Sequence, residues 1–307
     1  MMNTYVPRID KTNKKLVVIT VNYNGLDDTK KLIKSIYNSN FNELDIVVVD
    51  NGSINNESIN IKKEFPETIT IRNKSNLGFT GGFNTGLRYA LSKGYKFILI
   101  LNNDTILDKN AITELMEPLK NDRKIAFTSP KLLIWPKKNI LDFATSDANF
   151  KKSSFRINGH LELDSGKYNK KKEIDVMPGS AIMTRKEIIE EVGLFNEDYF
   201  TLHEDFELSY RVKIAGKKIL YVPSAKIFHK RGISGDTKNI LRNYLCARNR
   251  CLFVNKYLGF KDQISYYIYI FKEIYNKNKE KNILKGEIKG YIDGLLNKKG
   301  KPKWIKD

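Results

Sequence analysis

The chain has few cysteines, no secretory leader pattern and no apolar run long enough to cross a bilayer. Its two cysteines, Cys246 and Cys251, are too few for a disulfide framework in 307 residues and lack the spacing of metal ligands. A reducing, cytoplasmic setting is therefore expected. Residues 1–15 are polar and charged, unlike a secretory signal. Because a membrane span needs roughly 20 apolar residues, we expect a soluble or peripherally attached protein.

Acidic residues are scarce relative to basic ones. The sequence has 54 Lys and Arg against 35 Asp and Glu, which gives a formal net charge of +19. Such an excess favours an anionic partner, whether nucleic acid, an acidic membrane surface or a phosphorylated substrate. The hydrophobic content of 41% is ordinary for a globular protein, and the length allows one large domain or two.

Continuous apolar runs alternate with helical patterns over the first hundred residues. Strands are expected at residues 16–21, 45–50, 68–72 and 97–101. Helices are expected at about 27–37 and around 86–91. This alternation predicts an α/β protein with a mostly parallel central sheet flanked by helices. The polar residues that follow the strands are Asn22, Asp50, Asn73 and Asn102. One edge of the sheet should therefore carry the functional groups.

The second half of the chain changes character twice. Residues 137–172 read as a long polar insertion with hairpin character, close to a binding mouth. Sheet then returns at 174–183, followed by helices at about 185–192 and 209–213 and a strand at 218–222. From about Asp236 the pattern is helical, with helices at 241–253 and 261–275 and a basic helix or tail at 277–289. We therefore expect a catalytic domain over 1–235 and a helical region over 236–307.

The strand at 97–101 ends in two amides and a carboxylate, Asn102, Asn103 and Asp104. Ligands bind at the carboxyl ends of parallel strands in α/β proteins. A carboxylate at this place suits a divalent cation that bridges to phosphate oxygens, and Asn102 is suited to hydrogen-bond a ribose hydroxyl. The alternative is an Asn-Asp turn that leads into the next helix.

Two residues after the first strands suit a nucleoside. Tyr23 can stack on a nucleobase, and Asp50 can accept the ring N–H of a pyrimidine. The alternatives are an aromatic that covers the core and a turn capped by Asp50. The glycine-rich stretch 76–86 opens a helix, where backbone N–H groups favour phosphate. Its glycine spacing differs from G-x-G-x-x-G, so a dinucleotide site is not expected.

Two later segments carry acid–base and metal-binding side chains. Glu204 and Asp205 lie with a third carboxylate around an aromatic. Like charges this close raise at least one pKa, which suits a general base. The alternative is a helix N-terminus that these carboxylates stabilise. His229 follows an apolar run and suits Mn²⁺ or Mg²⁺ beside a carboxylate. Lys230 and Arg231 come next and suit a leaving diphosphate.

Together these segments resemble the family 2 glycosyltransferases, which have the GT-A fold. The resemblance covers roughly residues 15–235. It rests on the order and spacing of residues 18–24, 47–53, 76–79, 101–104, 178–181, 193–195, 204–205 and 229. Within the family the chain is most similar to a rhamnosyltransferase-like branch, which residues 243–250 and the basic tail also resemble.

The resemblance implies a role for each matching residue. The nucleotide would be bound by Tyr23, Asp50, Asn76 and Asn102. The divalent metal cofactor, Mn²⁺ or Mg²⁺, would be held by Asp104 and His229. The catalytic base would be Asp205. The diphosphate, sugar or acceptor would be contacted by Gly179, Ser180, Glu204, Lys230 and Arg231. Asn102 replaces the first acid of the family's D-x-D motif, so weaker metal binding is expected.

The implied reaction is inverting transfer of a sugar in cell-surface polysaccharide synthesis. The donor would be a dTDP- or UDP-sugar, with rhamnose a candidate, and the acceptor a glycan or a lipid-diphosphate-linked sugar. A basic nucleic-acid-binding protein is the first alternative. It predicts aromatics interleaved with Lys or Arg on an exposed surface, but here the polar residues cluster after apolar strands and the aromatics of the tail resemble core residues. No nucleic acid partner is therefore expected. A sugar nucleotidyltransferase is the second, but residues 22–25 lack its glycine-rich basic loop. A binding-only relative is disfavoured by the retained Asp104, Asp205 and His229.

The helical region 236–307 is rich in Lys, Tyr and Ile. Such helices can lie in a membrane interface, with lysines outward and aromatics inward. This reading places the enzyme in the cytoplasm, attached peripherally to the inner face of the cell membrane, with an anionic membrane surface as a partner. The alternative is a helical appendage on the catalytic domain whose lysines are simply solvated.

Overall fold

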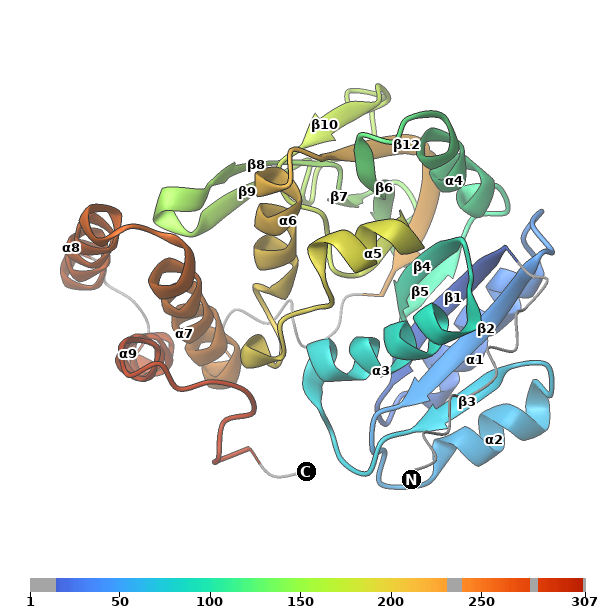
Figure 1. The fold of residues 1–307 in the computed structure, drawn as a ribbon, viewed down its shortest axis with the longest axis horizontal. Helices are drawn as coiled ribbons and strands as arrows, with labels where there is room; N and C mark the ends of the chain where they lie inside the picture. The colour runs from blue at the N-terminus through green and yellow to red at the C-terminus, as the bar shows by residue number, and fades with distance from the viewer. Residues whose placement is uncertain (1–14, 231–238, 277–280, 306–307) are drawn as a thin grey trace, which may run out of the picture.

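A parallel unit forms the amino-terminal half of the central sheet (Figure 1). The computed structural model describes residues 15–230, 239–276 and 281–305. The strands of this unit lie in the order β3-β2-β1-β4 and are β1 (Leu16–Asn22), β2 (Leu44–Asp50), β3 (Ile69–Arg72) and β4 (Phe97–Asn102). The connecting helices are α1 (Leu26–Tyr37), α2 (Glu57–Glu64) and α3 (Gly78–Lys93). Because helices cover both faces, β1, β2 and β4 are almost continuously apolar and buried.

The carboxyl ends of these strands meet in register. Val21 pairs with Asn102, Asn22 with Asp50, and Asp50 with Arg72. The predicted gathering of polar residues at one sheet edge is therefore confirmed.

The second half of the sheet is mixed. β11 (Ala181–Arg185) lies antiparallel between β4 and β6 (Ile125–Ile134), and β12 (Lys218–His229) continues the sheet parallel to β6. The short strands at this end are β5 (Thr105–Leu107), β7 (Leu141–Phe143) and β10 (Lys172–Ile174). The helices beside them are α4 (Ala111–Asn121), α5 (Lys186–Val192) and α6 (Glu204–Ile214).

Two details of this half differ from the sequence prediction. β6 was not anticipated, although it lies inside the sheet, between β12 and β11. The strand expected over 174–183 is instead interrupted between β10 and β11, and residues 178–180 of the break line a cavity. The insertion does contain the predicted hairpin, formed by β8 (Thr145–Asn149) and β9 (Ser154–Asn158) around the short helix η1 (Phe150–Lys152).

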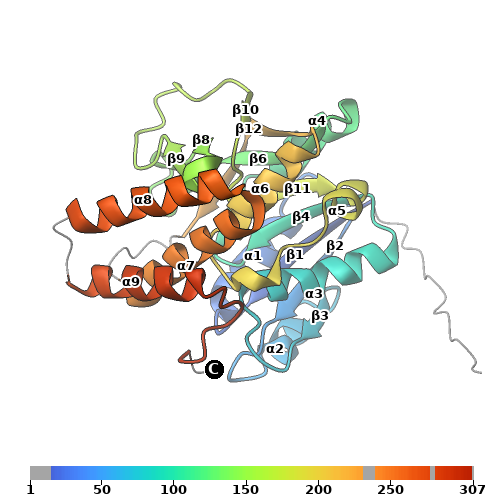
Figure 2. The same cartoon turned by 60° about the vertical axis from the view of Figure 1, so that its left-hand side comes forward.

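Three helices form the far end of the molecule: α7 (Ile240–Tyr257), α8 (Phe260–Asn276) and α9 (Lys281–Leu295) (Figure 2). They share an apolar cluster with α6, in which Phe206 meets Phe253 at a ring distance of 4.9 Å. α9 packs closely on α7 through glycines, since a Cβ at Gly290 would overlap the Tyr244 carbonyl oxygen. Within the described residues, no helix has the length and apolarity of a membrane span.

Candidate active site

A cavity of about 580 Å³ opens at the polar edge of the sheet. Six residues singled out from the sequence line it: Asn102, Gly179, Ser180, Glu204, Asp205 and His229. The backbone explains part of this meeting, because Asn102 N donates to Ser180 O at 2.8 Å. The insertion supplies an apolar wall, made by Phe143, Phe155, Ile157 and Leu161. The insertion therefore borders this cavity.

Glu204 and Asp205 form the first turn of α6, where a helix N-terminus favours negative charge. Burial raises the pKa of Asp205 to about 6, although backbone N–H groups, including that of Phe206, oppose the shift. Burial, and then the charge of Asp205, raise the pKa of Glu204 well above its usual range. Asp205 is therefore a carboxylate at neutral pH with more basicity than an ordinary aspartate.

Glu204 is only 5% exposed, and its Oε2 has no hydrogen-bond partner within the described residues. Gly179 lies beside it, and a Cβ at Gly179 would come within 3.4 Å of Glu204 Oε1. The glycine therefore keeps space open next to the two carboxylates. An unpaired buried oxygen of this kind is costly unless a ligand completes it.

The loop that leads into α6 is held by α7. Phe200, Leu202 and His203 all have positive φ, a region that non-glycine residues rarely adopt. The Nδ2 group of Asn249 donates to the carbonyl oxygens of residues 199, 201 and 202 at 3.1, 2.9 and 2.6 Å. Arg248 is also buried and donates to the carbonyl oxygen of residue 199 at 3.1 Å. The strained turn before Asp205 is thus fixed from the carboxyl-terminal region.

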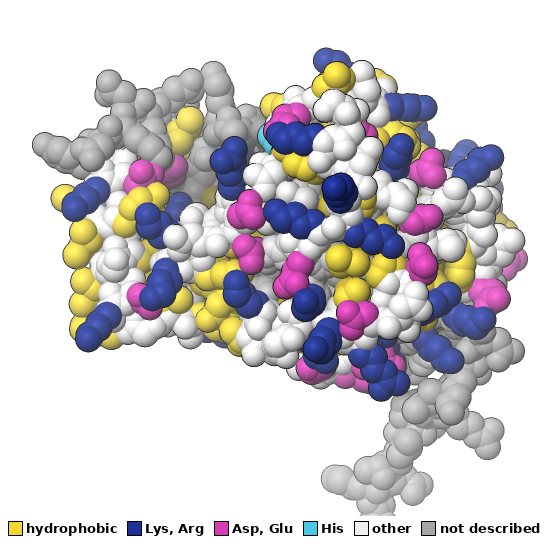
Figure 3. All heavy atoms as spheres, turned by 90° about the horizontal axis from the view of Figure 1, so that it is seen from above, with side chains coloured by type: hydrophobic (Ala, Val, Ile, Leu, Met, Phe, Trp, Pro, Cys, Tyr) yellow, Lys and Arg dark blue, Asp and Glu magenta, His cyan; other side chains and the backbone are white. Residues whose placement is uncertain are grey.

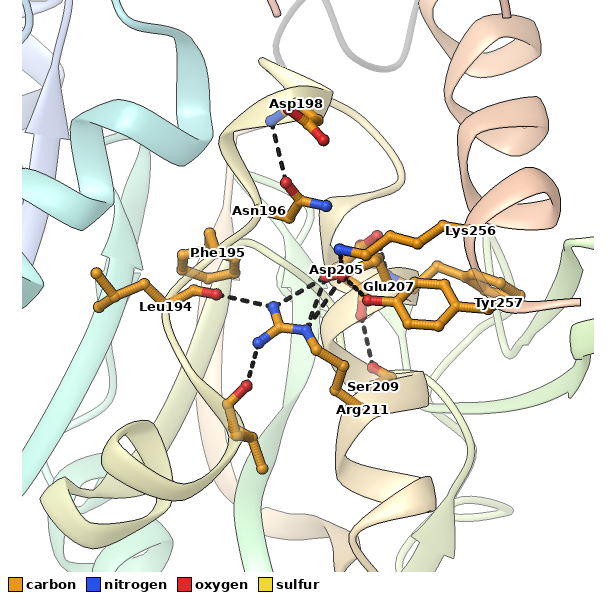
Figure 4. A network of polar contacts seen from close by, with 12 residues as sticks. Leu194, Phe195, Asn196, Asp198, Asp205, Glu207, Ser209, Arg211, Lys256 and Tyr257 are labelled. Atoms are coloured by element: carbon orange, nitrogen blue, oxygen red, sulfur yellow. Dashed lines mark hydrogen bonds and ion pairs between the residues drawn. The ribbon is translucent and has the colours of Figure 1, made fainter. Parts of the chain in front are cut away.

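α6 itself is anchored by the ion pair between the buried Glu207 and the half-buried Arg211 (Figure 4). The Arg211 guanidinium also donates to the backbone oxygens of Val192, the last residue of α5, and of Leu194. Tyr257 of α7 donates its hydroxyl to Glu207. These contacts connect α5, α6 and α7, so Asp205 sits on a helix that is braced on two sides.

His203 and the hairpin loop meet on the other side of the same turn. His203 stacks on Phe206 at 4.4 Å, and its Nε2 lies 2.8 Å from the Ser153 hydroxyl. Burial, and then the charge of Arg250, lower the pKa of His203 to about 3, so its imidazole is neutral. Arg250 of α7 donates to Ser153 O at 3.0 Å. The insertion is therefore fastened to both α6 and α7.

Asp104 and His229 are brought together by strand pairing. β5 begins directly after Asp104 and pairs antiparallel with the end of β12, so that Thr105 faces His229. His229 Nε2 then lies 3.3 Å from Asp104 Oδ1, and its Nδ1 lies 2.7 Å from Asp142 Oδ2. Burial disfavours charge on His229, but these two carboxylates outweigh it and raise its pKa to about 9. Asp142 was not anticipated from the sequence.

This pair has the chemistry of a partial metal site. Neutral imidazole nitrogen and carboxylate oxygen both suit Mn²⁺, so a bound cation would take the place of the proton on His229 Nε2. Asp142 orients the imidazole from behind, as carboxylates do for metal-bound histidines. Within the described residues, no three His, Cys, Asp or Glu side chains form a metal-ligand cluster. Asp104 and His229 therefore fit a cation that takes its remaining ligands from substrate and water.

Lys230 lies on the far side of this pair. It lines a second cavity of about 330 Å³ together with Asp104. Its Nζ is 3.0 Å from Asp28 Oδ2, at an exposed position. Arg231 lies outside the described residues.

The three remaining predicted residues lie outside the lining of the larger cavity. Asp50 is fully buried, accepts from Ser53 N at 2.9 Å and pairs with Arg72 at 3.0 Å. Tyr23 is 37% exposed at the end of β1. Asn76 uses its Oδ1 to accept from the Asn51 side chain at 3.1 Å and from Gly78 N at 2.8 Å, which shapes the turn before α3.

Two solved glycosyltransferase structures share this architecture. GalNAc-T7, crystallised with UDP, GalNAc and Mn²⁺, superimposes with a TM-score of 0.67 at 15% identity, over 92% of this chain and 56% of that one. The mannosyltransferase PcManGT from Pyrobaculum calidifontis, in complex with GDP-Man and Mn²⁺, gives a TM-score of 0.55 at 15% identity, over 94% and 73%. At this identity the likeness concerns the fold.

Sequence relatives agree with the fold. The chain is 26% identical over 298 residues to the low-salt glycan biosynthesis hexosyltransferase Agl10 of Haloferax volcanii, covering 94% of this chain and 93% of that protein. It is 24% identical over 211 residues to the poly-beta-1,6-N-acetyl-D-glucosamine synthase of Staphylococcus aureus, covering 66% and 47%. The chain thus spans about half the length of that synthase. The glycosyl transferase family 2 model matches residues 17–193. The chain therefore belongs to glycosyl transferase family 2 and has the GT-A fold.

Proposed function

We propose that this glycosyltransferase is an inverting hexosyltransferase with Asp205 as its catalytic base. The observation that carries the proposal is the position of Asp205, which lines the large cavity with a raised pKa, together with Asn102, Ser180 and His229. A base at this place can take a proton from an acceptor hydroxyl near neutral pH. The hexosyltransferase name of the Haloferax relative supports the sugar class.

In the proposed step, the acceptor oxygen attacks the anomeric carbon from the face opposite the leaving group. The hydroxyl proton passes to Asp205, a new carbon–oxygen bond forms, and the bond to the diphosphate oxygen breaks. The nucleoside diphosphate leaves with the bond's electron pair. Glu204 Oε2, buried and unpaired, would accept a hydrogen bond from a sugar hydroxyl beside Gly179 and Ser180.

The donor would be a nucleotide diphospho-sugar held at the strand ends. Tyr23, Asp50, Asn76 and Asn102 are the proposed nucleotide contacts. Asp50 lies at the end of β2, where its carboxylate accepts from Ser53 N and pairs with Arg72. UDP in the GalNAc-T7 structure supports this donor class. We propose a UDP- or dTDP-sugar, with dTDP-rhamnose among the candidates that the rhamnosyltransferase-like pattern favours.

A divalent metal would be held by Asp104 and His229. When bound, it would neutralise charge on the departing diphosphate. Mn²⁺ in both structural neighbours supports this cofactor, and Mg²⁺ is the alternative. Lys230 and Arg231 follow His229 in the chain, and we propose that they bind the same diphosphate.

The acceptor would be a glycan or a lipid-diphosphate-linked sugar of a cell-surface polysaccharide. The glycan and polysaccharide products named for the two sequence relatives support this. We place the enzyme in the cytoplasm, at the inner face of the membrane, where a lipid-linked acceptor would be reached.

A donor screen tests the proposal. The protein is incubated with Mn²⁺ and a panel of UDP- and dTDP-sugars, and release of nucleoside diphosphate is measured without acceptor and with lipid-linked sugars. We expect turnover of at least one donor, lost on chelation and restored by Mn²⁺. Absence of turnover with the whole panel, in protein that binds UDP or dTDP, would overturn the proposed donor class.

A further inference from the structure

The outer faces of α8 and α9 carry apolar side chains that the fold leaves uncovered. On α8 these are Phe260, Ile264, Ile268 and Phe271, a spacing that puts them on one side of the helix. Phe260 and Phe271 are 76% and 72% exposed. We propose that the exposed apolar sides of α8 and α9, together named the α8–α9 face, dock on an anionic lipid membrane. This inference deepens the proposed function. It rests on that function only for the lipid-linked acceptor that such a membrane would present.

α9 presents a matching stripe, made by Ile288, Ile292 and Leu295, and Leu296 directly after the helix extends it. Leu284 joins Ile288 and Ile292 in lining a shallow groove of about 560 Å³. Figures 1 and 2 both show α8 and α9 at the same end of the molecule, away from the amino-terminal strands. The two stripes therefore belong to one end of the molecule.

The exposed stripes are separate from the side chains that hold the helices in place. α8 packs inward with Tyr266 and Ile270, which are buried in the cluster shared with α6 and α7. α9 packs on α7 through Gly286, Gly290 and Gly294. A helix with apolar side chains on both its inner and its outer side is expected to contact apolar groups on both sides. The outer stripes therefore require an occupant that the described residues do not supply.

Lysines identify that occupant. Exposed lysines border the stripes, namely Lys261, Lys272, Lys285 and Lys289. Figure 3 shows hydrophobic side chains and Lys or Arg side chains next to one another at this end of the molecule. From residue 236 onward, basic residues outnumber acidic ones by more than two to one. A second copy would bring lysine against lysine, whereas an anionic lipid surface complements both the charge and the apolar side chains.

α7 connects the α8–α9 face to the proposed active site. The helix on which α9 packs also carries Asn249, which fixes the turn before Asp205, and Arg242, which lines the large cavity. A protein seated on the α8–α9 face would therefore hold its catalytic cavity near the membrane, where a lipid-linked acceptor lies.

Flotation of the full chain with vesicles tests the inference. We compare vesicles of equal parts phosphatidylglycerol and phosphatidylcholine with vesicles of phosphatidylcholine alone. The variants are I268E/F271E, which places charge in the stripe, K272Q/K285Q, which removes charge from its border, and I214E as a control. Ile214 is 61% exposed at the end of α6, outside the α8–α9 face.

We expect the wild type and I214E to float with anionic vesicles at low salt. I268E/F271E should bind the anionic vesicles at least about tenfold more weakly than the wild type. K272Q/K285Q should also bind them more weakly, and its binding should depend less on salt. Salt of about 1 M, where the Debye length is about 3 Å, should release the wild type. Equal binding by all four proteins, no flotation at low salt, or a wild-type dimer that I268E/F271E dissociates would each overturn the inference.

The same proteins separate this inference from the proposed function. Donor hydrolysis without vesicles should be equal in the wild type and I268E/F271E, because the stripe does not line the cavity. Flotation by a protein that uses no nucleotide sugar would leave the docking face standing and remove only the proposed reaction.

Discussion

The side-chain amide of Asn249 donates to the carbonyl oxygen of Leu202 at 2.6 Å, and so ties α7 to the turn that precedes Asp205. The same amide holds two further carbonyl oxygens of this turn. Asn249 is fully buried and lies beyond residues 17–193, the part matched by the family model. The carboxyl-terminal helices thus contribute to the geometry of the proposed site.

The substitution N249A should therefore lower activity, although Asn249 does not contact the substrate in the proposed site. The carbonyl groups of residues 201 and 202 would lose this donor, whereas that of residue 199 would keep Arg248. A displaced turn would move Asp205, for which a misplacement near 1 Å costs about 10²-fold in rate. We expect kcat to fall by about that factor, nucleotide affinity to stay unchanged, and stability to drop by about 1–3 kcal/mol. Steady-state kinetics, nucleotide titration and thermal unfolding measure the three quantities.

N255A provides the matched control for this prediction. Asn255 is also on α7, but its Nδ2 donates to Gly294 O at 3.2 Å, away from the catalytic turn. We expect a modest loss of stability in N255A with kcat retained. Equal losses of kcat in the two variants would show that Asn249 acts only through general stability.

The activity of the enzyme should follow the charge of Asp205. Its pKa is raised to about 6 by burial, so the basic form is lost as the pH falls through this value. We expect kcat to rise with pH up to a plateau above about 6, whereas an ordinary aspartate would place this rise near 4. A pH–rate profile measures it, and a rise centred near 4 would remove Asp205 from the role of base.

Removal of Asp142 should weaken metal binding. Its Oδ2 lies 2.7 Å from His229 Nδ1, and loss of such an orienting carboxylate typically costs 10–100-fold in affinity. We expect D142N to bind Mn²⁺ about 10–100-fold more weakly in calorimetry, in the presence of nucleoside diphosphate. D164N is the control, because Asp164 lies elsewhere in the insertion and pairs with Lys131 of β6 at 2.8 Å. Equal Mn²⁺ affinity of D142N and wild type would contradict the assignment.

The sequence was sufficient for most strands and for the residues at their ends. β1, β2 and β4 are continuous apolar runs, and polar residues follow them directly, so local pattern alone locates both. The first turn of α6 was also accessible, because Glu204 and Asp205 suit a helix N-terminus as well as a catalytic role.

Features that depend on distant partners could not be predicted. β6 contains Pro130 and the buried Lys131, which break an apolar pattern, and Lys131 is stabilised by Asp164 from the insertion. Asn249 reads as an ordinary polar residue of a helix, since the carbonyl groups it holds lie almost fifty residues earlier. Asp142 likewise reaches His229 only through the folding of the insertion.

The most direct measurement is the turnover of D205N beside the wild type, with Mn²⁺ and a donor that the wild type uses. Loss of general-base help predicts a fall in kcat of about 10²–10⁴-fold, with nucleotide affinity in calorimetry unchanged because Asp205 lies apart from Tyr23 and Asp50 in the proposed site. Turnover by D205N within a few-fold of wild type, in folded protein that binds nucleotide normally, would contradict the assignment of Asp205 as the catalytic base.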